Sequence, residues 1–171
     1  MNVSGGLVSA VIWAEEDGIV NISGGAVHTV GLRGGPNILN ISGQSSVDRV
    51  FSYITGTVNV SGGLVDWLYA TDSSTVNLSG GSVNDLDVEG NGILTFNAAN
   101  TLWYDLGGLS LDGSRLLGSG VLSGEWTDGT MFSTNVAASG GGGAVPEPLT
   151  VMSALIGLGM IGGYIKKRRA A

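Results

Sequence analysis

A short block of residues recurs at a nearly fixed spacing through the first half of the chain. The block reads Asn, an apolar residue, Ser, Gly, and then Gly or Gln. Its copies begin at Asn2, Asn21, Asn40, Asn59 and Asn77, so the intervals are equal except for the last, which is one residue shorter. A period of about 20 residues is typical of a solenoid, in which each repeat forms one coil and stacks on the next.

Apolar residues recur at matching positions on both sides of each block, with a spacing that is mostly two. This is the period of β-strands with one buried face. We expect an interior formed by side chains such as Val3, Val8, Val11 and Trp13 in the first repeat, Ile22, Val27, Val30 and Leu32 in the second, and Val60, Val65, Leu68 and Ala70 in the fourth. The third repeat has one extra residue, which predicts a bulge or a widened turn.

The predicted fold class is all-β, because apolar residues show no sustained helical period before residue 149. One repeat cannot bury its apolar side alone, so the repeats must stack at about 4.8 Å per rung. We expect a parallel β-solenoid of about five 19-residue rungs over residues 1–92, with glycines supplying the left-handed backbone of the corners. A degraded sixth copy at 94–97 opens a β cap over residues 93–138, which covers the end of the solenoid.

The cap region contains four aromatic residues that have no place in the repeat. We expect these to form the core of the cap, and the alternative is an exposed aromatic platform for a glycan: Trp103, Tyr104, Trp126 and Phe132.

The five repeat asparagines each precede a serine by two positions, so they match glycosylation sequons. In a stack the same residues lie one above another, and their amides can hydrogen-bond from rung to rung. We favour this asparagine ladder, because the repeat places Asn before every Ser-Gly corner whether or not it is modified.

The C-terminal residues form three consecutive parts after a Gly-rich linker at 139–144. They are Val145, Pro146, Glu147 and Pro148, then the uncharged run 149–165, then Lys166, Lys167, Arg168 and Arg169. The 17-residue run would form a helix of about 25 Å, enough for one short transmembrane span. The basic residues are expected to stop in the cytoplasm, which leaves the preceding chain on the outer side.

This order of motif, span and basic end closely resembles the PEP-CTERM signal of Gram-negative surface proteins, over residues 145–169 only. The resemblance implies sorting by an exosortase that cuts near the Pro-Glu-Pro motif. It also implies export, first to the inner membrane and then to the cell surface or extracellular matrix. The same profile is labelled an ice-binding protein C-terminal domain, which describes the tail and implies nothing about ice. The alternatives are an ordinary membrane anchor and a buried core helix.

The N-terminal residues 1–14 fall in register with the repeat and show neither a basic segment nor a cleavage pattern. We therefore expect the native protein to be longer, with a signal peptide and further repeats upstream.

Residues 1–148 hold all 14 acidic residues but only three arginines. This acidity argues against nucleic acid as a partner, because such binding depends on neutralising phosphates. Asp85, Asp87 and Glu89 alternate, so their carboxylates face one side of a strand and form a weak candidate for calcium. The alternative is a solvated acidic face, and no other metal or cofactor is expected.

The sequence offers no catalytic constellation. It has no cysteine, no lysine before Lys166 and a single histidine, His28, at a position expected to face outward. We expect an exported surface or extracellular-matrix protein with a structural or adhesive role in a biofilm, and not an enzyme. Its expected partners are the exosortase, the membrane and extracellular polysaccharide. The alternative is the C-terminal part of a larger secreted carbohydrate-active enzyme.

Overall fold

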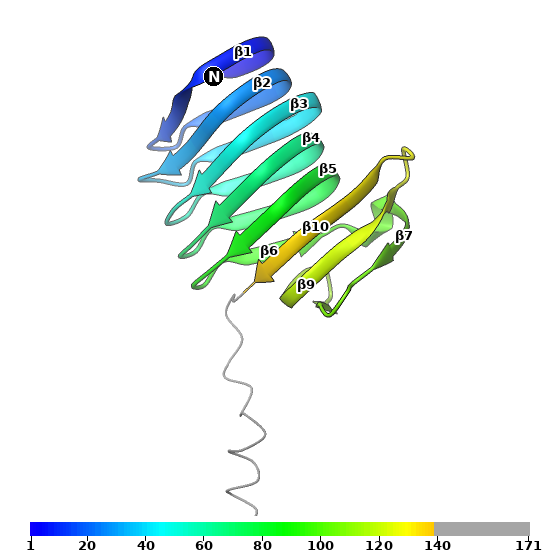
Figure 1. The fold of residues 1–171 in the computed structure, drawn as a ribbon. Coiled ribbons are helices and arrows are strands. Elements are labelled where there is room, and N and C mark those ends of the chain that lie inside the picture. The colour runs from blue at the N-terminus through cyan, green and yellow to red at the C-terminus, as the bar shows by residue number, and fades with distance from the viewer. Residues whose placement is uncertain (139–171) are drawn as a thin grey trace, which may run out of the picture. The chain divides into compact units, whose positions relative to one another are not determined.

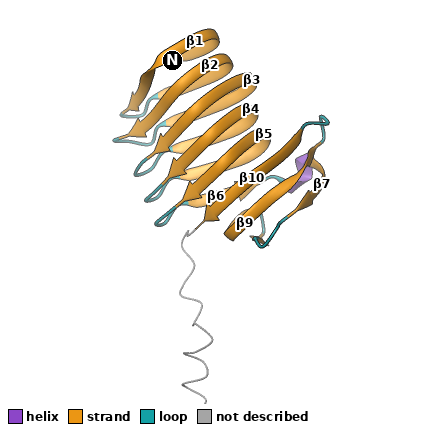
Figure 2. Ribbon diagram, in the orientation of Figure 1, coloured by secondary structure: helices purple, strands orange, loops and turns teal. Residues whose placement is uncertain are grey.

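The computed structural model describes residues 1–138, which form ten strands and one short 3₁₀ turn (Figures 1 and 2). Five long strands follow the five repeats: β1 (Asn2–Glu15), β2 (Ile19–Arg33), β3 (Ile38–Ser52), β4 (Thr57–Ala70) and β5 (Thr75–Val88). The remaining elements are β6 (Ile93–Phe96), η1 (Ala98–Asn100), β7 (Thr101–Asp105), β8 (Ser110–Asp112), β9 (Arg115–Trp126) and β10 (Met131–Ala138). The predicted all-β class and the stack of about five turns are confirmed.

Each long strand turns back on itself at a glycine corner, so that one rung has two layers (Figure 1). We call the part before the corner the first arm and the part after it the second arm. The corner glycines have positive φ, for example 81° at Gly25 and 76° at Gly63, a conformation that costs glycine little. A Cβ added at Gly25 would lie 2.5 Å from the carbonyl oxygen of Gly6. The corner of the second rung therefore stacks too closely on the first to admit a side chain at Gly25.

The long strands pair in parallel and in register, with Asn above Asn throughout. The extra residue of the third repeat lies at its corner: Ile22 pairs with Ile41, but Gly24 pairs with Gln44. This irregularity confirms the predicted bulge and leaves both arms of β3 aligned with their neighbours.

Apolar side chains from both arms form continuous columns inside the stack. Most of them are fully buried, among them Ile22, Ile41 and Val60 in the first arms and Val27, Val30, Val50, Val65, Leu68 and Leu86 in the second arms. Burial of this kind contributes about 25 cal/mol for each Å² of apolar surface removed from water, so these columns supply the main stabilisation of the solenoid.

The second arm of β1 departs from the prediction. Its register shifts between Val8 and Val11, so that Trp13 pairs with Gly31 rather than with Leu32. As a result, Val11 and Trp13 face outward, whereas Ile12 and Ala14 are buried. The predicted inward positions of Val11 and Trp13 were therefore wrong. Gly31 makes the shift feasible, because the Trp13 ring occupies the space that a side chain there would need.

The sixth rung is assembled from two separate segments. β6 pairs in parallel with the first arm of β5, with Leu94 beside Val76. β10 pairs in parallel with the second arm of β5, with Val136 beside Leu86. The intervening β9 pairs antiparallel with β10 and carries β7 and β8 on its other side. The degraded sixth copy thus forms only the first arm of its rung.

The cap core contains two of the four expected aromatic residues. Trp126 and Phe132 are buried, with ring centroids 4.4 Å apart, and both contact Phe96 of β6. The Trp126 indole also donates a hydrogen bond of 2.7 Å to the Gly81 carbonyl, which ties the cap to the last full corner. Trp103 and Tyr104 on β7 remain more than 40% exposed. The prediction that all four form the cap core was therefore only half right.

Within residues 1–138 there is no helix long and apolar enough to cross a membrane. The predicted linker 139–144, motif 145–148, span 149–165 and basic end 166–169 lie outside the described residues.

Candidate functional site: an aromatic and acidic outer face

The outer surface of the first arms carries the asparagine ladder. Each Asn amide nitrogen donates to the side-chain oxygen of the Asn one rung earlier, over 2.7–2.8 Å. The rungs joined in this way are those of Asn2, Asn21, Asn40, Asn59 and Asn77. In the sixth rung Thr95 takes the Asn position, and its hydroxyl donates to Asn77. The ladder satisfies polar side chains along the stack, and it therefore has a structural role in the first arms.

The outer surface of the second arms carries five aromatic side chains from three rungs. We call this group the aromatic strip: Trp13, Phe51, Tyr53, Trp67 and Tyr69. Pairing of β3 with β4 places Phe51 beside Tyr69 and Arg49 beside Trp67. The Trp67 ring centroid lies 5.4 Å from that of Phe51 and 6.2 Å from that of Tyr69. These separations are within the range of favourable aromatic contacts, so the rings hold one another in place outside the core.

Trp13 continues the strip toward the first rung. The guanidinium carbon of Arg33 lies 4.2 Å from the centroid of the Trp13 ring, in a cation–π arrangement. Arg33 also forms an ion pair of 2.7 Å with Glu15. Trp13 is therefore covered on one side by a paired cation, whereas Trp67 and Tyr69 contact neighbouring rings and donate to carboxylates.

Three carboxylates border the aromatic strip on its cap side. The Trp67 indole nitrogen donates to Asp87 over 3.1 Å, and the Tyr69 hydroxyl donates to Glu89 over 2.8 Å. Asp85 accepts a hydrogen bond of 2.9 Å from Asn135 on β10. Hydrogen bonding to Glu89 raises the pKa of Tyr69, with desolvation as a smaller cause. Each carboxylate thus has its own partner and retains acceptor capacity for another donor.

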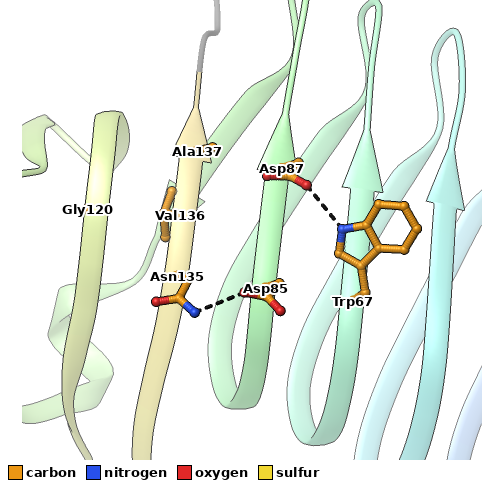
Figure 3. Close-up of a pocket in the computed structure, with 7 residues that line it drawn as sticks. All are labelled: Trp67, Asp85, Asp87, Gly120, Asn135, Val136 and Ala137. Carbon is orange, nitrogen blue, oxygen red and sulfur yellow. Dashed lines mark hydrogen bonds between the residues drawn. The ribbon is translucent and has the colours of Figure 1, made fainter.

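A groove runs beside these carboxylates, between β5 and β10 (Figure 3). It consists of two hollows of about 390 and 310 Å³, which share Asp87 and Ala137. The first is lined by Trp67, Asp85, Asp87, Gly120, Asn135, Val136 and Ala137. The second is lined by Asp87, Glu89, Gly118, Ser119, Ala137 and Ala138. The surface falls away here because the large side chains of β3 and β4 give way to Ala and Gly on β10 and β9.

The carboxylates of Asp85, Asp87 and Glu89 do share one face of the strand, as their alternation predicted. Across the part of the chain that the structure describes, no group of three or more acidic or histidine side chains is arranged to hold a metal ion. Calcium binding at these residues stays a prediction.

The other outward polar residues pair with their neighbours along the stack. His28 faces outward as expected, with its Nδ1 2.9 Å from a carboxylate oxygen of Asp48. Asp66 accepts a hydrogen bond of 2.9 Å from Asn84. Asp48 and Asp66 thus add a further row of outward carboxylates to the acidic face formed by Asp85, Asp87 and Glu89.

Sequence reasoning missed the aromatic strip and the groove. The strip was hidden because outward positions vary between repeats, and Trp13 was placed in the interior. Phe51 and Tyr69 are separated by one repeat, as are Arg49 and Trp67. An alignment of the outward positions of the third and fourth repeats would therefore have shown that aromatic residues lie beside one another on the outer face. The groove depends on the pairing of β10 with β5, which the repeat pattern does not predict.

Comparison with known proteins gives no match, whether to a protein family, to a curated protein or to a solved structure.

Proposed function

We propose that the chain is an exported protein of the cell surface or extracellular matrix, with a structural or adhesive role. An exosortase sorts it through residues 145–169, and the β-solenoid is the part presented outside. The first arms, with their asparagine ladder, serve rigidity, and the second arms serve contact with other molecules.

The observation that carries the adhesive role is the aromatic strip on the outer face. Large aromatic side chains gain most by burial, and the cap buries Trp126 and Phe132 accordingly. Holding Phe51, Trp67 and Tyr69 outside the core forgoes part of that gain. Aromatic residues are also enriched at binding surfaces, so their position supports a role in recognition.

The sorting step is supported by the tail sequence. Proline lacks a backbone N–H group and favours an extended backbone, so a motif with Pro146 and Pro148 suits binding by a processing enzyme. A permanent anchor would need only the apolar run and the basic residues.

The test is to express the chain behind a signal peptide in a host that carries an exosortase. The mature C-terminus is then mapped by mass spectrometry. We expect the wild type to lose residues 149–171. Replacement of Pro146, Glu147 and Pro148 by alanine should leave membrane insertion intact and block this loss. The matched control replaces three neighbouring linker residues, Gly141, Gly142 and Gly143, by alanine, and it should be processed like the wild type. Equal processing of the Pro-Glu-Pro variant, or a wild type that keeps its tail, would leave a plain membrane anchor.

A further inference from the structure

We propose that the groove between β5 and β10, with the Trp67 indole lying at its rim, binds a neutral polysaccharide. This inference deepens the adhesive role proposed above, because it names the binding surface and the class of ligand.

The groove has a shape that suits an extended ligand. Its two hollows share Asp87 and Ala137 and follow one another in the direction of the strands. Each has the volume of a small ligand site. Because the two hollows continue one another along β5 and β10, they suit an extended chain that lies along the surface better than a compact molecule.

The Trp67 side chain is held in one orientation. Figure 3 shows its indole lying on the outer face of the sheet, with the ring nitrogen turned toward Asp87. The hydrogen bond to Asp87 and the contacts with Phe51 and Tyr69 fix the ring. A fixed aromatic ring loses little conformational entropy on binding, and its face suits the C–H surface of a sugar ring.

A set of polar groups lies beside the Trp67 ring. Asp85, Asp87 and Asn135 line the same hollow as Trp67. Their free oxygens are hydrogen-bond acceptors, and bonds to ionised acceptors are the stronger kind. Sugar hydroxyls are the matching donors. A flat apolar ring beside a row of acceptors is complementary to a molecule with both C–H faces and hydroxyl edges.

Charge selects among polysaccharides. The groove is bordered by Asp85, Asp87 and Glu89, and residues 1–138 contain only three arginines. This negative field disfavours polymers of uronic acids or sulfated sugars. A neutral chain meets no such repulsion, and it can still use the ring and the acceptors.

The experiment uses affinity electrophoresis of the full chain in a detergent without a sugar headgroup. The gels contain neutral polysaccharides (mixed-linkage β-glucan, xyloglucan, galactomannan or dextran), with polygalacturonate and a glucosamine oligomer as charged probes. We expect at least one neutral polymer to retard the wild type and polygalacturonate to have no effect. Trp67→Ala should weaken binding about tenfold or more, as for other aromatic anchors.

Two further variants make the result decisive. Ala137→Ile adds bulk where the hollows meet and should also abolish retardation. Isoleucine suits a strand, and the substitution removes no existing contact. Trp103→Ala is the matched control, because its half-exposed indole likewise donates to a carboxylate, Glu125, over 3.1 Å but lines neither hollow. It should bind like the wild type. Circular dichroism checks folding, and Ala137→Ile alone decides if Trp67→Ala does not fold.

The proposal is overturned if no neutral polymer retards the wild type, or if Ala137→Ile binds as well as the wild type. It is also overturned if only the glucosamine oligomer binds, in a way that salt abolishes and Trp67→Ala does not affect. Such a result would indicate charge attraction by the acidic face. If polysaccharide binding fails but the tail is processed correctly, the proposed ligand is refuted and the sorting proposal is unaffected.

Discussion

The solenoid stack (β1–β5) and the cap (β6–β10) bury their apolar side chains by different means. In the stack each rung is one continuous repeat of the chain, and most of the buried apolar positions recur in the next rung. In the cap one rung is divided between β6 and β10, and an antiparallel sheet is inserted between them. The stack is stabilised by aliphatic columns, whereas the cap relies on a cluster of Phe96, Trp126 and Phe132.

The difference shows what ends a solenoid. A rung of aliphatic residues would leave another open face below it, because it presents the same apolar columns and unpaired strand edge as the rung before. Bulky rings and a change of strand direction interrupt that pattern. The site proposed above lies where the two architectures meet, since β5 supplies its carboxylates and β10 its floor.

The largest effect is expected from a charge in the stack. Val60→Asp places a carboxylate at a fully buried position of the fourth rung, where no partner is available. We expect a loss of more than about 4 kcal/mol in the free energy of unfolding. The matched control is Leu64→Asp in the same rung, which is 42% exposed and should change stability by about 0.5 kcal/mol or less. Equal urea midpoints for the two variants would refute the inward position of Val60.

The second test addresses the independence of stack and cap. Trp126→Ala removes a buried ring and leaves the Gly81 carbonyl without its indole donor. Such a truncation costs about 3–5 kcal/mol. Because rungs contact only their neighbours, we expect hydrogen exchange to accelerate in β9, β10 and β5 while β1 to β3 stay protected. Trp103→Ala should leave all strands protected. Uniform acceleration through β1 in the Trp126 variant would mean that stack and cap unfold as one unit.

The smallest effect is expected within the ladder. Asn59 makes two side-chain hydrogen bonds, to Asn40 and from Asn77, whereas Asn2 makes only the bond from Asn21. Asn59→Ala should therefore cost about 1–2 kcal/mol and Asn2→Ala about 0.5 kcal/mol. Chemical denaturation of both variants measures the difference. If Asn2→Ala proves as costly as Asn59→Ala, the ladder does not gain from its interior position.

The sequence allowed prediction of those features that recur. The inward position of Val60, the corner at Gly63 and the widened corner of the third repeat all follow from aligning one repeat with another. Trp13 was misplaced because a register shift in one rung is a local event that the average repeat conceals. The pairing of β10 with β5 could not be predicted, since its 50-residue separation has no counterpart in the repeat. The groove, which depends on that pairing, was missed for the same reason.

The divided sixth rung also has a consequence for the order of folding. Neighbouring rungs of the stack join residues about 19 apart, whereas Asn135 must reach Asp85 across 50 residues. The longer loop adds only about 0.9 kcal/mol of closure entropy, so its thermodynamic cost is small. Until β10 reaches the stack, however, the second arm of β5 is an edge without its partner, open to pairing with another chain. β10, the last of the strands within residues 1–138, is therefore the one that ends this exposure.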